Sequence, residues 1–438
     1  MNFQGLTGKV ITPFDKEYGI LRLEYNLDIN KFPLAIVYCY DYIDVSNAIK
    51  WCKQNCIALR IRTRGHNYEG YSTGTGVLVI DTSHMNKINI IAQNDVAVIQ
   101  AGAMLENVYS KLADQGYGFN GGTCPTVGIS GLVLGGGIGL SCRNFGLVTD
   151  DLLEIQIVNE NGVLLTANDH INCELFWACR GAGGGNFGVV ISYTFNIHKV
   201  DKVTVIQLRW NEVSREAFFA LWQCFFKTAT KKISCFAGFN KEGTYLNGFF
   251  YGNKSEAEKI LKNFLLLPGL LKNSSIEYVP FICAVKAIAS FYGPPNRFKS
   301  TGRFVYKPLS EKNIKKLVEF VDNSPGEDNC FIRLYSLGGA IKELPSDSTA
   351  FYYRNAEYII GVTADWEKDD TAKFFKKWVA EVLQYVNPLT NGSYVNFPYA
   401  ELQNYGNAYY GKNYPRLIEV KQIYDPDNIF NFPQSIKP

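Results

Sequence analysis

The stretch GGTCPTVGISGLVLGGGIGLSC, residues 121–142, places a cysteine at the start of a run of glycines. Glycine lets the backbone adopt positive φ and approach a ligand closely, at an entropic cost of about 0.5–1 kcal/mol each within regular structure. Because the chain accepts this cost repeatedly here, the run predicts a large, flat ligand lying against bare backbone. The thiol of Cys124, at the mouth of the run, could form a bond to that ligand.

The composition indicates a well-packed globular protein. Hydrophobic residues make up 47% of the 438 residues and charged residues 19%, which argues against a disordered chain. A chain of this length predicts two or three domains. The formal net charge is only +3, with no long run of one sign, and this argues against nucleic-acid binding.

The sequence offers no feature for membrane insertion or export. No window reaches the length of apolar residues that a membrane-spanning helix needs. The start, MNFQGLTGKVITPFDKEYG, has no basic segment followed by an apolar one, so we expect no signal peptide. The 11 cysteines are an odd number, and we expect most of them to be reduced and buried in a cytoplasmic protein.

Three blocks follow one another along the chain. Residues 1–200 combine Gly-rich loops with short β-branched runs and two amphipathic helical segments. In residues 201–390 the predicted strands are close enough in sequence to pair antiparallel, with helices on one face, which is an α+β pattern. Ser255 and Glu258 predict a capping box at one helix start in this block. Residues 391–438 are rich in Tyr and Asn.

A second informative stretch is RTRGHNYEGYSTGTG, residues 62–76, directly after the strand-like IALRI. Arg, Gly, His and Asn on such a turn can present backbone N–H groups and positive charge to a pyrophosphate. Taken alone, His66 is an ordinary loop histidine and Cys124 a buried small hydrophobic residue. Because both lie in Gly-rich turns after β-like runs, the two together favour one shared site.

Two other patterns predict no site. GAGGGNFG, residues 181–188, contains a formal G-x-G-x-x-G, but it follows a helix-like segment and precedes a strand. The dinucleotide fingerprint requires the opposite order, so we predict no Rossmann site, and the chain contains no P-loop motif. Cys52 and Cys56 lie one helical turn apart without a nearby histidine or second thiol pair, which favours buried helix-face cysteines over a metal site.

Four segments together resemble the FAD-linked oxidases of the berberine-bridge-enzyme-like family, within the vanillyl-alcohol-oxidase superfamily: RTRGHNYEGYS, GGTCPTVGISGLVLGGGIGLSCRNFGLVTDDLL, ELFWACRGAGGGNFGVV and YYGKNYPRLIEVKQIYDPDNIFNFPQSI. The resemblance implies an α+β fold with a PCMH-type FAD-binding domain of two α+β subdomains, formed by residues 1–200 and completed by residues 391–438. It also implies a substrate domain, residues 201–390, whose antiparallel sheet is covered by helices and roofs the isoalloxazine ring.

The resemblance implies that FAD is bound covalently by both His66 and Cys124. The matching positions expected around the pyrophosphate are Arg64, Gly65, Asn67 and Tyr68. Those expected behind the ring and ribityl chain are Gly128, Ser130, Gly131 and Gly135, with the backbone of Val190 near the adenine. Tyr394 and Asn396 match positions that reach the flavin. Val127 matches the position that gates oxygen, and a valine there resembles the oxygen-reactive members.

The sequence departs from the family at the catalytic base. Members that oxidise alcohols usually carry a tyrosine directly after the C-terminal Asn, and here that position is Phe397, which cannot accept a proton. A tyrosine base also needs a partner that lowers its pKa, and the partner positions align with Ile359 and Gly361. Several tyrosines are candidate substitutes: Tyr352, Tyr353, Tyr358 and Tyr399.

The resemblance implies an oxidase that transfers a hydride from a small-molecule substrate, such as a sugar, an oligosaccharide or another alcohol, to the flavin. Oxygen would then take the electrons and form H2O2. Two alternatives stay open: a dehydrogenase that uses another acceptor, and a flavoprotein that has lost alcohol oxidation because of Phe397. No metal is expected. The aromatic-rich roof suits both sugar faces and aromatic rings.

Overall fold

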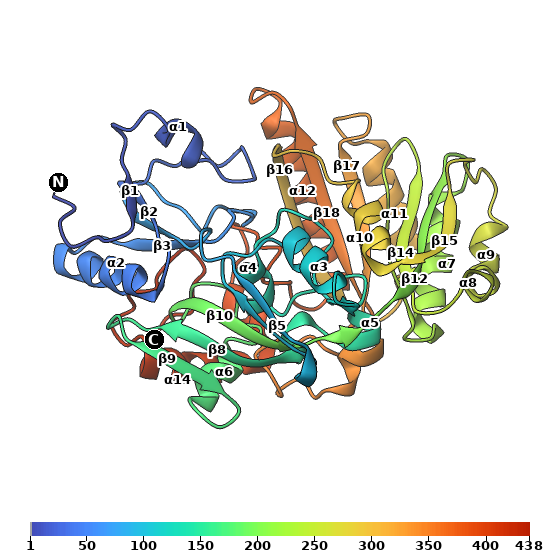
Figure 1. Ribbon diagram of the computed structural model, residues 1–438. Helices are drawn as coiled ribbons and strands as arrows, with labels where there is room; N and C mark the ends of the chain where they lie inside the picture. Colours follow the sequence, from blue (N-terminus) through green and yellow to red (C-terminus); the bar gives the residue numbers. More distant parts are fainter. Residues whose placement is uncertain (1) are drawn as a thin grey trace.

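The computed structural model describes residues 2–438 and contains sheets of four, five and seven strands, together with a two-stranded ribbon (Figure 1). The four-stranded and five-stranded sheets are built from the first 200 residues, and the seven-stranded sheet from residues 202–366. The predicted α+β fold class, with an antiparallel sheet in the second half of the chain, is confirmed.

The four-stranded sheet carries the first of the two Gly-rich loops at its edge. Its strands are β1 (Lys9–Ile11), β2 (Ala35–Tyr38), β3 (Leu59–Arg62) and β4 (Leu78–Asp81). β2, β4 and β3 are parallel, and β1 pairs antiparallel with β2. The helices of this region are α1 (Tyr18–Leu21) and α2 (Tyr42–Asn55). α2 begins at Asp41, whose side chain accepts two backbone N–H bonds, and it buries Val45, Ile49 and Trp51.

The five-stranded sheet is antiparallel throughout and holds the second Gly-rich loop against its helices. Its strands are β5 (Ile88–Ile91), β6 (Val96–Gln100), β8 (Leu152–Val158), β9 (Leu164–Asn168) and β10 (Val189–Asn196). β7 (Tyr117–Gly118) and β11 (His198–Lys199) form the ribbon. The helices between these strands are α3 (Leu105–Ala113), α4 (Ile129–Leu134), α5 (Cys142–Phe145) and α6 (Cys173–Ala178).

The seven-stranded sheet has the order β15-β12-β14-β13-β17-β18-β16. Its strands are β12 (Lys202–Trp210), β13 (Ile233–Phe239), β14 (Thr244–Phe250), β15 (Ser275–Pro280), β16 (Arg297–Val305), β17 (Cys330–Ser336) and β18 (Tyr358–Trp366). One face packs against five helices: α7 (Arg215–Thr228), α8 (Lys254–Ile260), α9 (Lys262–Leu265), α11 (Glu311–Asp322) and α12 (Ala372–Val386). α10 (Phe281–Ala289) instead packs on the core of the five-stranded sheet, beside α3.

Alternation along β17 and β18 assigns side chains to the two faces of this sheet. Ile332 and Leu334 in β17, and Tyr358 and Ile360 in β18, are buried against the helices. The residues between them point to the opposite face, as the period of two requires. This face looks toward the Gly-rich loops.

The C-terminal segment returns to the first half of the molecule through α13 (Tyr405–Tyr410) and α14 (Tyr414–Tyr424). The ammonium of Lys421 is fully buried and donates to the carbonyls of Asn186 (2.6 Å) and Phe430 (2.8 Å) and to the carboxylate of Asp425. A buried charge is stable only when it is fully bonded in this way. Lys421 therefore fixes the chain end to the 181–188 loop.

Two local predictions are corrected. The capping box at α8 uses Asn253 and Glu256 and not Ser255 and Glu258, because the helix begins two residues earlier. Cys52 is buried, but Cys56 is exposed at the end of α2 with φ of 54°.

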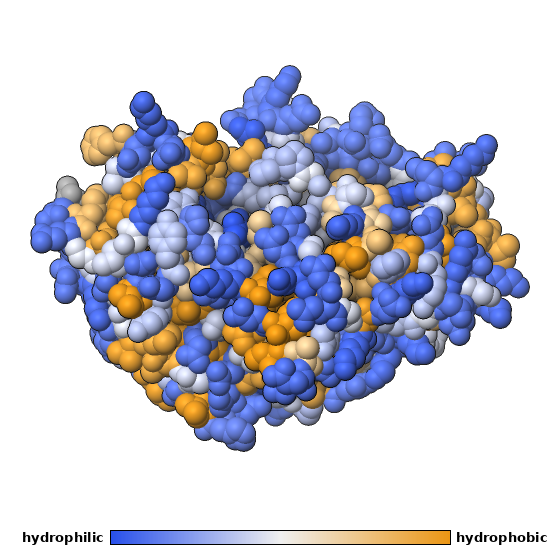
Figure 2. All heavy atoms as spheres, viewed as in Figure 1, coloured by the Kyte–Doolittle hydropathy of each residue, from blue (hydrophilic) through white to orange (hydrophobic). Residues whose placement is uncertain are grey.

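The surface is mixed in character. Figure 2 shows hydrophilic side chains interspersed with apolar ones over the face of Figure 1. Within residues 2–438 no helix combines the length and apolarity needed to cross a membrane.

Candidate active site

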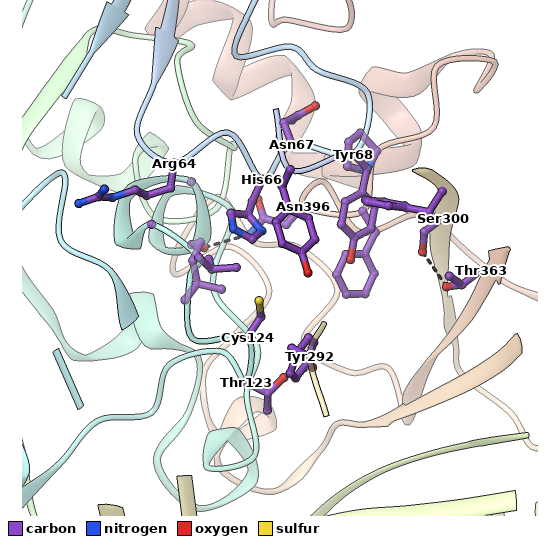
Figure 3. A pocket seen from close by; sticks show the side chains of 18 of the residues that line it. Arg64, His66, Asn67, Tyr68, Thr123, Cys124, Tyr292, Ser300, Thr363 and Asn396 are labelled. Atoms are coloured by element: carbon purple, nitrogen blue, oxygen red, sulfur yellow. Dashed lines mark hydrogen bonds between the residues drawn. The ribbon is translucent and has the colours of Figure 1, made fainter. Parts of the chain in front are cut away.

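One cavity of about 630 Å³ lies between the two Gly-rich loops and the free face of the seven-stranded sheet (Figure 3). The loop after β3 and the segment leading into α4 form one side. Strands β12, β13, β14, β16, β17 and β18 form the roof, and the segment around Asn396 closes one end. Among residues 2–438, no cluster of three or more His, Cys, Asp or Glu side chains could hold a metal ion.

The floor of the cavity is bare backbone. A Cβ added to Gly131 would meet no protein atom within 4 Å, because it would project into open space. Gly184, from the loop before β10, lies beside Gly131, and its own Cβ would stand 3.7 Å from the Cα of Gly131. Gly183 adopts φ of +88°, which favours glycine. A flat ring system fits this floor, and a side chain at Gly131 would occupy its place.

His66 lies in the loop after β3, with its ring stacked on Tyr25 at 4.1 Å between centroids. Its Nε2 is 3.1 Å from the hydroxyl of Thr126. Burial lowers the pKa of His66 to about 4, so its imidazole is neutral near pH 7. A neutral imidazole keeps a nitrogen lone pair, which is what bond formation to a ligand requires.

Cys124 faces the same cavity, and Figure 3 shows its sulfur directed toward the side where His66 lies. The sulfur is 3.6 Å from the hydroxyl of Thr126, the group that His66 also contacts. Burial raises the pKa of the thiol, and hydrogen bonds from Thr126 and from the backbone of Val127 oppose the rise. The structure thus brings together the two residues that the sequence predicted to share a site.

Polar side chains of the loop after β3 form hydrogen bonds with backbone groups and fix the shape of the loop. Arg64 donates to the carbonyls of Gly102 (3.1 Å) and Ser83 (2.9 Å), and it lines the cavity. Asn67 accepts two backbone N–H bonds within its own loop. Gly65 has φ of +68°. These three residues line the cavity, together with Val127 and Gly128, and their role around a pyrophosphate stays a prediction.

Tyr68 lines the cavity on the side of the roof. Its ring stacks on Phe397 at 5.4 Å and meets Phe298 of β16 edge-on at 5.2 Å. Figure 3 shows Tyr68 and Arg64 on opposite sides of the cavity. The side chain of Tyr68 therefore points away from Arg64, and its place beside a pyrophosphate stays a prediction.

Four residues predicted to contact the flavin do not line the cavity: Ser130, Gly135, Val190 and Tyr394. The hydroxyl of Ser130 donates to the carbonyl of Ala101 at 2.8 Å. The side chain of Val190 is buried in the core of the five-stranded sheet. The hydroxyl of Ser130 is thus used within the protein, and the predicted approach of the Val190 backbone to an adenine stays a prediction.

Gly135 and Tyr394 contact the side chain of Asn396, which lines the cavity. A Cβ on Gly135 would overlap the side-chain amide of Asn396, so glycine is required for that side chain to fit. The amide of Asn396 donates to the carbonyl of Leu132 and to the hydroxyl of Tyr394, both at 3.0 Å. Gly135 and Tyr394 therefore fix Asn396 and do not line the cavity themselves.

The prediction that Tyr353 or Tyr358 replaces the missing base is wrong. Tyr353 is buried and donates its hydroxyl to the carbonyl of Ala408 at 2.7 Å. Tyr358 points to the helix-covered face of the sheet and donates to Gln223 at 3.3 Å. Neither lines the cavity, and Tyr352 and Tyr399 do not line it either. Phe397 does line it, as expected.

The roof carries polar and aromatic side chains that the sequence reasoning did not identify: Arg209, Tyr245, Asn247, Tyr292, Arg333, Tyr335, Thr363 and Asp365. Burial alone would lower the pKa of Arg333, but the surrounding tyrosines raise it above its ordinary value. Burial raises the pKa of Asp365, and the charge of Arg333 opposes this. A permanent cation thus lies among phenol groups over the cavity.

The 181–188 loop is a further part of the site. It follows α6 and precedes β10, so the rejection of a Rossmann motif on the order of elements is correct. Gly183 and Gly184 nevertheless line the cavity, and Asn186 does as well. The glycines of this loop are a signal for a ligand contact, but no pattern in the sequence shows that they lie beside Gly131 in the same cavity floor.

Comparisons with known proteins agree with this site. The family model described as "FAD binding domain" matches residues 33–168, and the model "Berberine and berberine like" matches residues 393–437. An uncharacterized FAD-linked oxidoreductase of Bacillus subtilis, YgaK, is 37% identical over 99% of this chain and 97% of its own. Reticuline oxidase of Eschscholzia californica is 28% identical over 93% of this chain and 83% of its own.

Solved structures show the same fold. Physcomitrella patens BBE-like 1 superposes with a TM-score of 0.91 at 32% identity, over 98% of this chain and 97% of that one. A glycine-to-alanine variant of the berberine bridge enzyme, described as a reticuline dehydrogenase, has a TM-score of 0.88 at 26% identity, over 100% of this chain and 98% of that one.

The matched segments include both Gly-rich loops of the cavity, and the open floor at Gly131 fits the flat ring of FAD. FAD is therefore the cofactor, and its hydride chemistry makes the protein an oxidoreductase that acts on a small molecule. With 37% identity to YgaK over nearly its whole length, the chain belongs to the berberine-bridge-enzyme-like family of FAD-linked oxidoreductases.

Proposed function

We propose that this protein is an FAD-linked oxidase that removes a hydride from a small-molecule alcohol, such as a sugar or oligosaccharide, and passes the electrons to O2 to give H2O2. The flavin is tethered by both His66 and Cys124. The observation that carries the proposal is that these two side chains reach the same hydroxyl, that of Thr126, in a cavity floored by glycine.

The protonation state of His66 suits its role in the tether. Its pKa of about 4 leaves the imidazole neutral. Nε2 is engaged by the hydroxyl of Thr126, which leaves Nδ1 as the nitrogen available to form a bond. Tyr25, stacked on the ring, limits its rotation. A tether at two points fixes the ring system between the glycine floor and the sheet.

Two small residues near Cys124 support oxygen as the acceptor. In solved variants of the berberine bridge enzyme, the replaced glycine stands two residues before the replaced cysteine, and the glycine variant is described as a dehydrogenase. A relative of this chain from Eschscholzia californica is named reticuline oxidase. Gly122 and Cys124 have the same spacing here, and Val127 lines the cavity.

The roof supports a polar substrate with flat faces. Tyr245, Tyr292 and Phe298 offer aromatic surface, and Asn247 and Asp365 offer hydrogen-bonding groups. Sugars combine a flat face with several hydroxyls, and this combination matches such walls. In this proposal residues 1–200 and 391–438 hold the cofactor, and residues 201–390 bind the substrate.

Acid precipitation of the purified protein tests the tether. We expect the yellow colour to stay in the pellet for the wild type and to be lost only when His66→Ala and Cys124→Ala are combined. The exposed residues His170 and Cys224 provide matched controls, since their replacement by Ala should leave the colour in the pellet. Colour released into the supernatant by the wild type would contradict a covalent bond.

Reoxidation by air tests whether O2 is the electron acceptor, and substrate screening tests whether the substrate is an alcohol. A photoreduced oxidase regains its colour within seconds of mixing with air, whereas slow recovery would favour a dehydrogenase with another acceptor. A panel of sugars, alcohols and amines identifies the reducing substrate. A yellow protein that none of them reduces would favour the second alternative, a flavoprotein that has lost alcohol oxidation, for which Phe397 is the supporting observation.

A further inference from the structure

The ring of Phe397 occupies a flat place on the free face of the sheet. A Cβ added to Gly302 of β16 would stand 2.8 Å from Cδ2 of Phe397, so the ring lies directly over that glycine. The ring of Tyr68 stacks on it at 5.4 Å with 9° between the ring planes, and the ring of Tyr394 meets it edge-on at 5.0 Å. The ring is thus fixed from both sides, and it carries no group that accepts a proton.

A second ring lies beside Phe397 in the same way. Gly361 of β18 pairs directly with Gly302, and a Cβ on Gly361 would stand 2.9 Å from Cε2 of Tyr335. The ring of Tyr335 therefore crosses from β17 over Gly361, to within 5.4 Å of the ring of Phe397. A side chain at position 361 would prevent this. The paired glycines thus leave space on this face of the sheet, and the rings of Phe397 and Tyr335 lie over them next to each other.

Arg333 supplies the partner charge for this tyrosine. It pairs with Gly361 in the register of β17 and β18, two residues before Tyr335 on the same face. Its Nε is buried and has no hydrogen-bond partner among residues 2–438. Burial raises the pKa of Tyr335, and the charge of Arg333 is the first of the influences that oppose the rise. A cation that stays protonated favours the phenolate over the phenol.

We propose that Tyr335, held over Gly361 and paired with Arg333, is the base that accepts the proton of the substrate hydroxyl in place of the residue at position 397. The inference rests on the proposed oxidation of an alcohol. The hydroxyl proton passes to the phenolate oxygen of Tyr335, and a hydride leaves the same carbinol carbon for the flavin. The carbinol becomes a carbonyl. Bound FAD would supply the hydride acceptor, and O2 would then take the two electrons together with that hydrogen and the proton released from Tyr335, which forms H2O2 and regenerates the phenolate.

The groups that face Tyr335 determine the direction of the pH dependence. Besides Arg333, they are Tyr245 and Tyr292, with Tyr68 and Asp365 around the same arginine. Tyr335 must be deprotonated to accept a proton, and burial raises its pKa. The rate of flavin reduction therefore rises toward alkaline pH, and Arg333, a positioning residue, keeps that rise closer to neutrality.

The test measures anaerobic flavin reduction by stopped flow between pH 6 and 10, with the hydroxyl compound of the panel that reduces the wild-type holoenzyme fastest. Positioned bases contribute about 100- to 10,000-fold in rate, so Tyr335→Phe should lower the reduction rate by at least about 100-fold and remove its rise with pH. Arg333→Met should shift the rise to higher pH. Tyr278→Phe, an exposed tyrosine on the edge strand of the same sheet, is the control.

A relocated hydroxyl separates catalysis from packing. Phe397→Tyr combined with Tyr335→Phe returns one phenol to the adjacent place and should recover part of the lost rate, which a purely structural role would not allow. Tyr335→Phe with wild-type rate and pH profile would overturn the inference. So would a yellow wild-type enzyme that amines reduce and no hydroxyl compound does, an outcome that leaves the FAD assignment intact because that assignment rests on the family match and the glycine floor.

Discussion

The hydroxyl of Thr126 lies 3.1 Å from Nε2 of His66, across the mouth of the cofactor cavity. Thr126 stands two residues after Cys124, on the segment that leads into the glycine floor, whereas His66 comes from the loop after β3. This contact joins the two loops and gives the imidazole a fixed orientation. An imidazole held through one nitrogen presents the other to the cavity.

Removing this hydroxyl should slow tether formation. A neutral hydrogen bond contributes about 0.5–1.5 kcal/mol, which corresponds to about a 2- to 10-fold change. We expect Thr126→Ala to attach added FAD more slowly by this factor, measured as flavin fluorescence retained in denaturing gels over time. Thr126→Ser, which keeps the oxygen, should attach FAD at the wild-type rate. Equal rates for Ala and wild type would show that the contact does not orient His66.

The buried imidazole predicts a pH dependence of stability in protein prepared without flavin. Burial lowers the pKa of His66 from 6.5 to about 4. Between these values the unfolded chain binds a proton that the folded chain does not, so the free energy of unfolding falls as pH is lowered through this window. We expect the loss of melting temperature from pH 7 to pH 5 to be smaller in His66→Gln than in the wild type. The exposed His170→Gln should lose as much as the wild type.

The loops of the site could be predicted from local motifs, whereas the roof could be predicted only from the alternation of side chains along its strands. The contacts around His66, Cys124 and Asn67 come from contiguous loops, so the local motif was sufficient to find them. The roof comes from six strands spread over more than a hundred residues, and no local motif joins them. A signal was present: residues 358, 360, 362, 364 and 366 are Tyr, Ile, Val, Ala and Trp, an apolar row that faces the helices. That row excludes Tyr358 from the cavity, and the same reasoning in β17 exposes Arg333 and Tyr335.

Side chains that act through others were the harder part. The sequence pattern marks Gly135 and Tyr394 as close to the flavin, and each stands within three residues of one that lines the cavity. Only the folded structure shows that Gly135 makes room for Asn396 and that Tyr394 holds the same amide. Which glycine faces a ligand and which faces a neighbour depends on packing, and spacing along the chain does not determine it.

Oxygen reactivity should depend on Gly122. An added Cβ there would stand 3.4 Å from Leu105 and 3.6 Å from Leu132, which are ordinary contacts. Gly122→Ala should therefore fold and load FAD normally. We expect its photoreduced flavin to be reoxidised by air at least about tenfold more slowly, a barrier increase of about 1.4 kcal/mol, while reduction by substrate is unchanged. Reoxidation at the wild-type rate would remove Gly122 from the support for an oxidase.

Two glycines of the same turn should respond in opposite ways to alanine. At Gly135, the residue that ends α4, the added Cβ overlaps Asn396. Gly135→Ala should therefore lower the melting temperature measured by calorimetry, and Asn396→Gly in the same chain should restore part of it.

At Gly131, inside α4, an added Cβ meets no protein atom within 4 Å, and alanine is favoured over glycine in a helix by about 1 kcal/mol. Gly131→Ala should thus keep or raise the melting temperature of the flavin-free protein, yet load less FAD because its methyl group occupies the floor. Calorimetry and the ratio of flavin to protein absorbance measure the two effects. If Gly131→Ala bound FAD as well as the wild type, the ring could not lie on this floor.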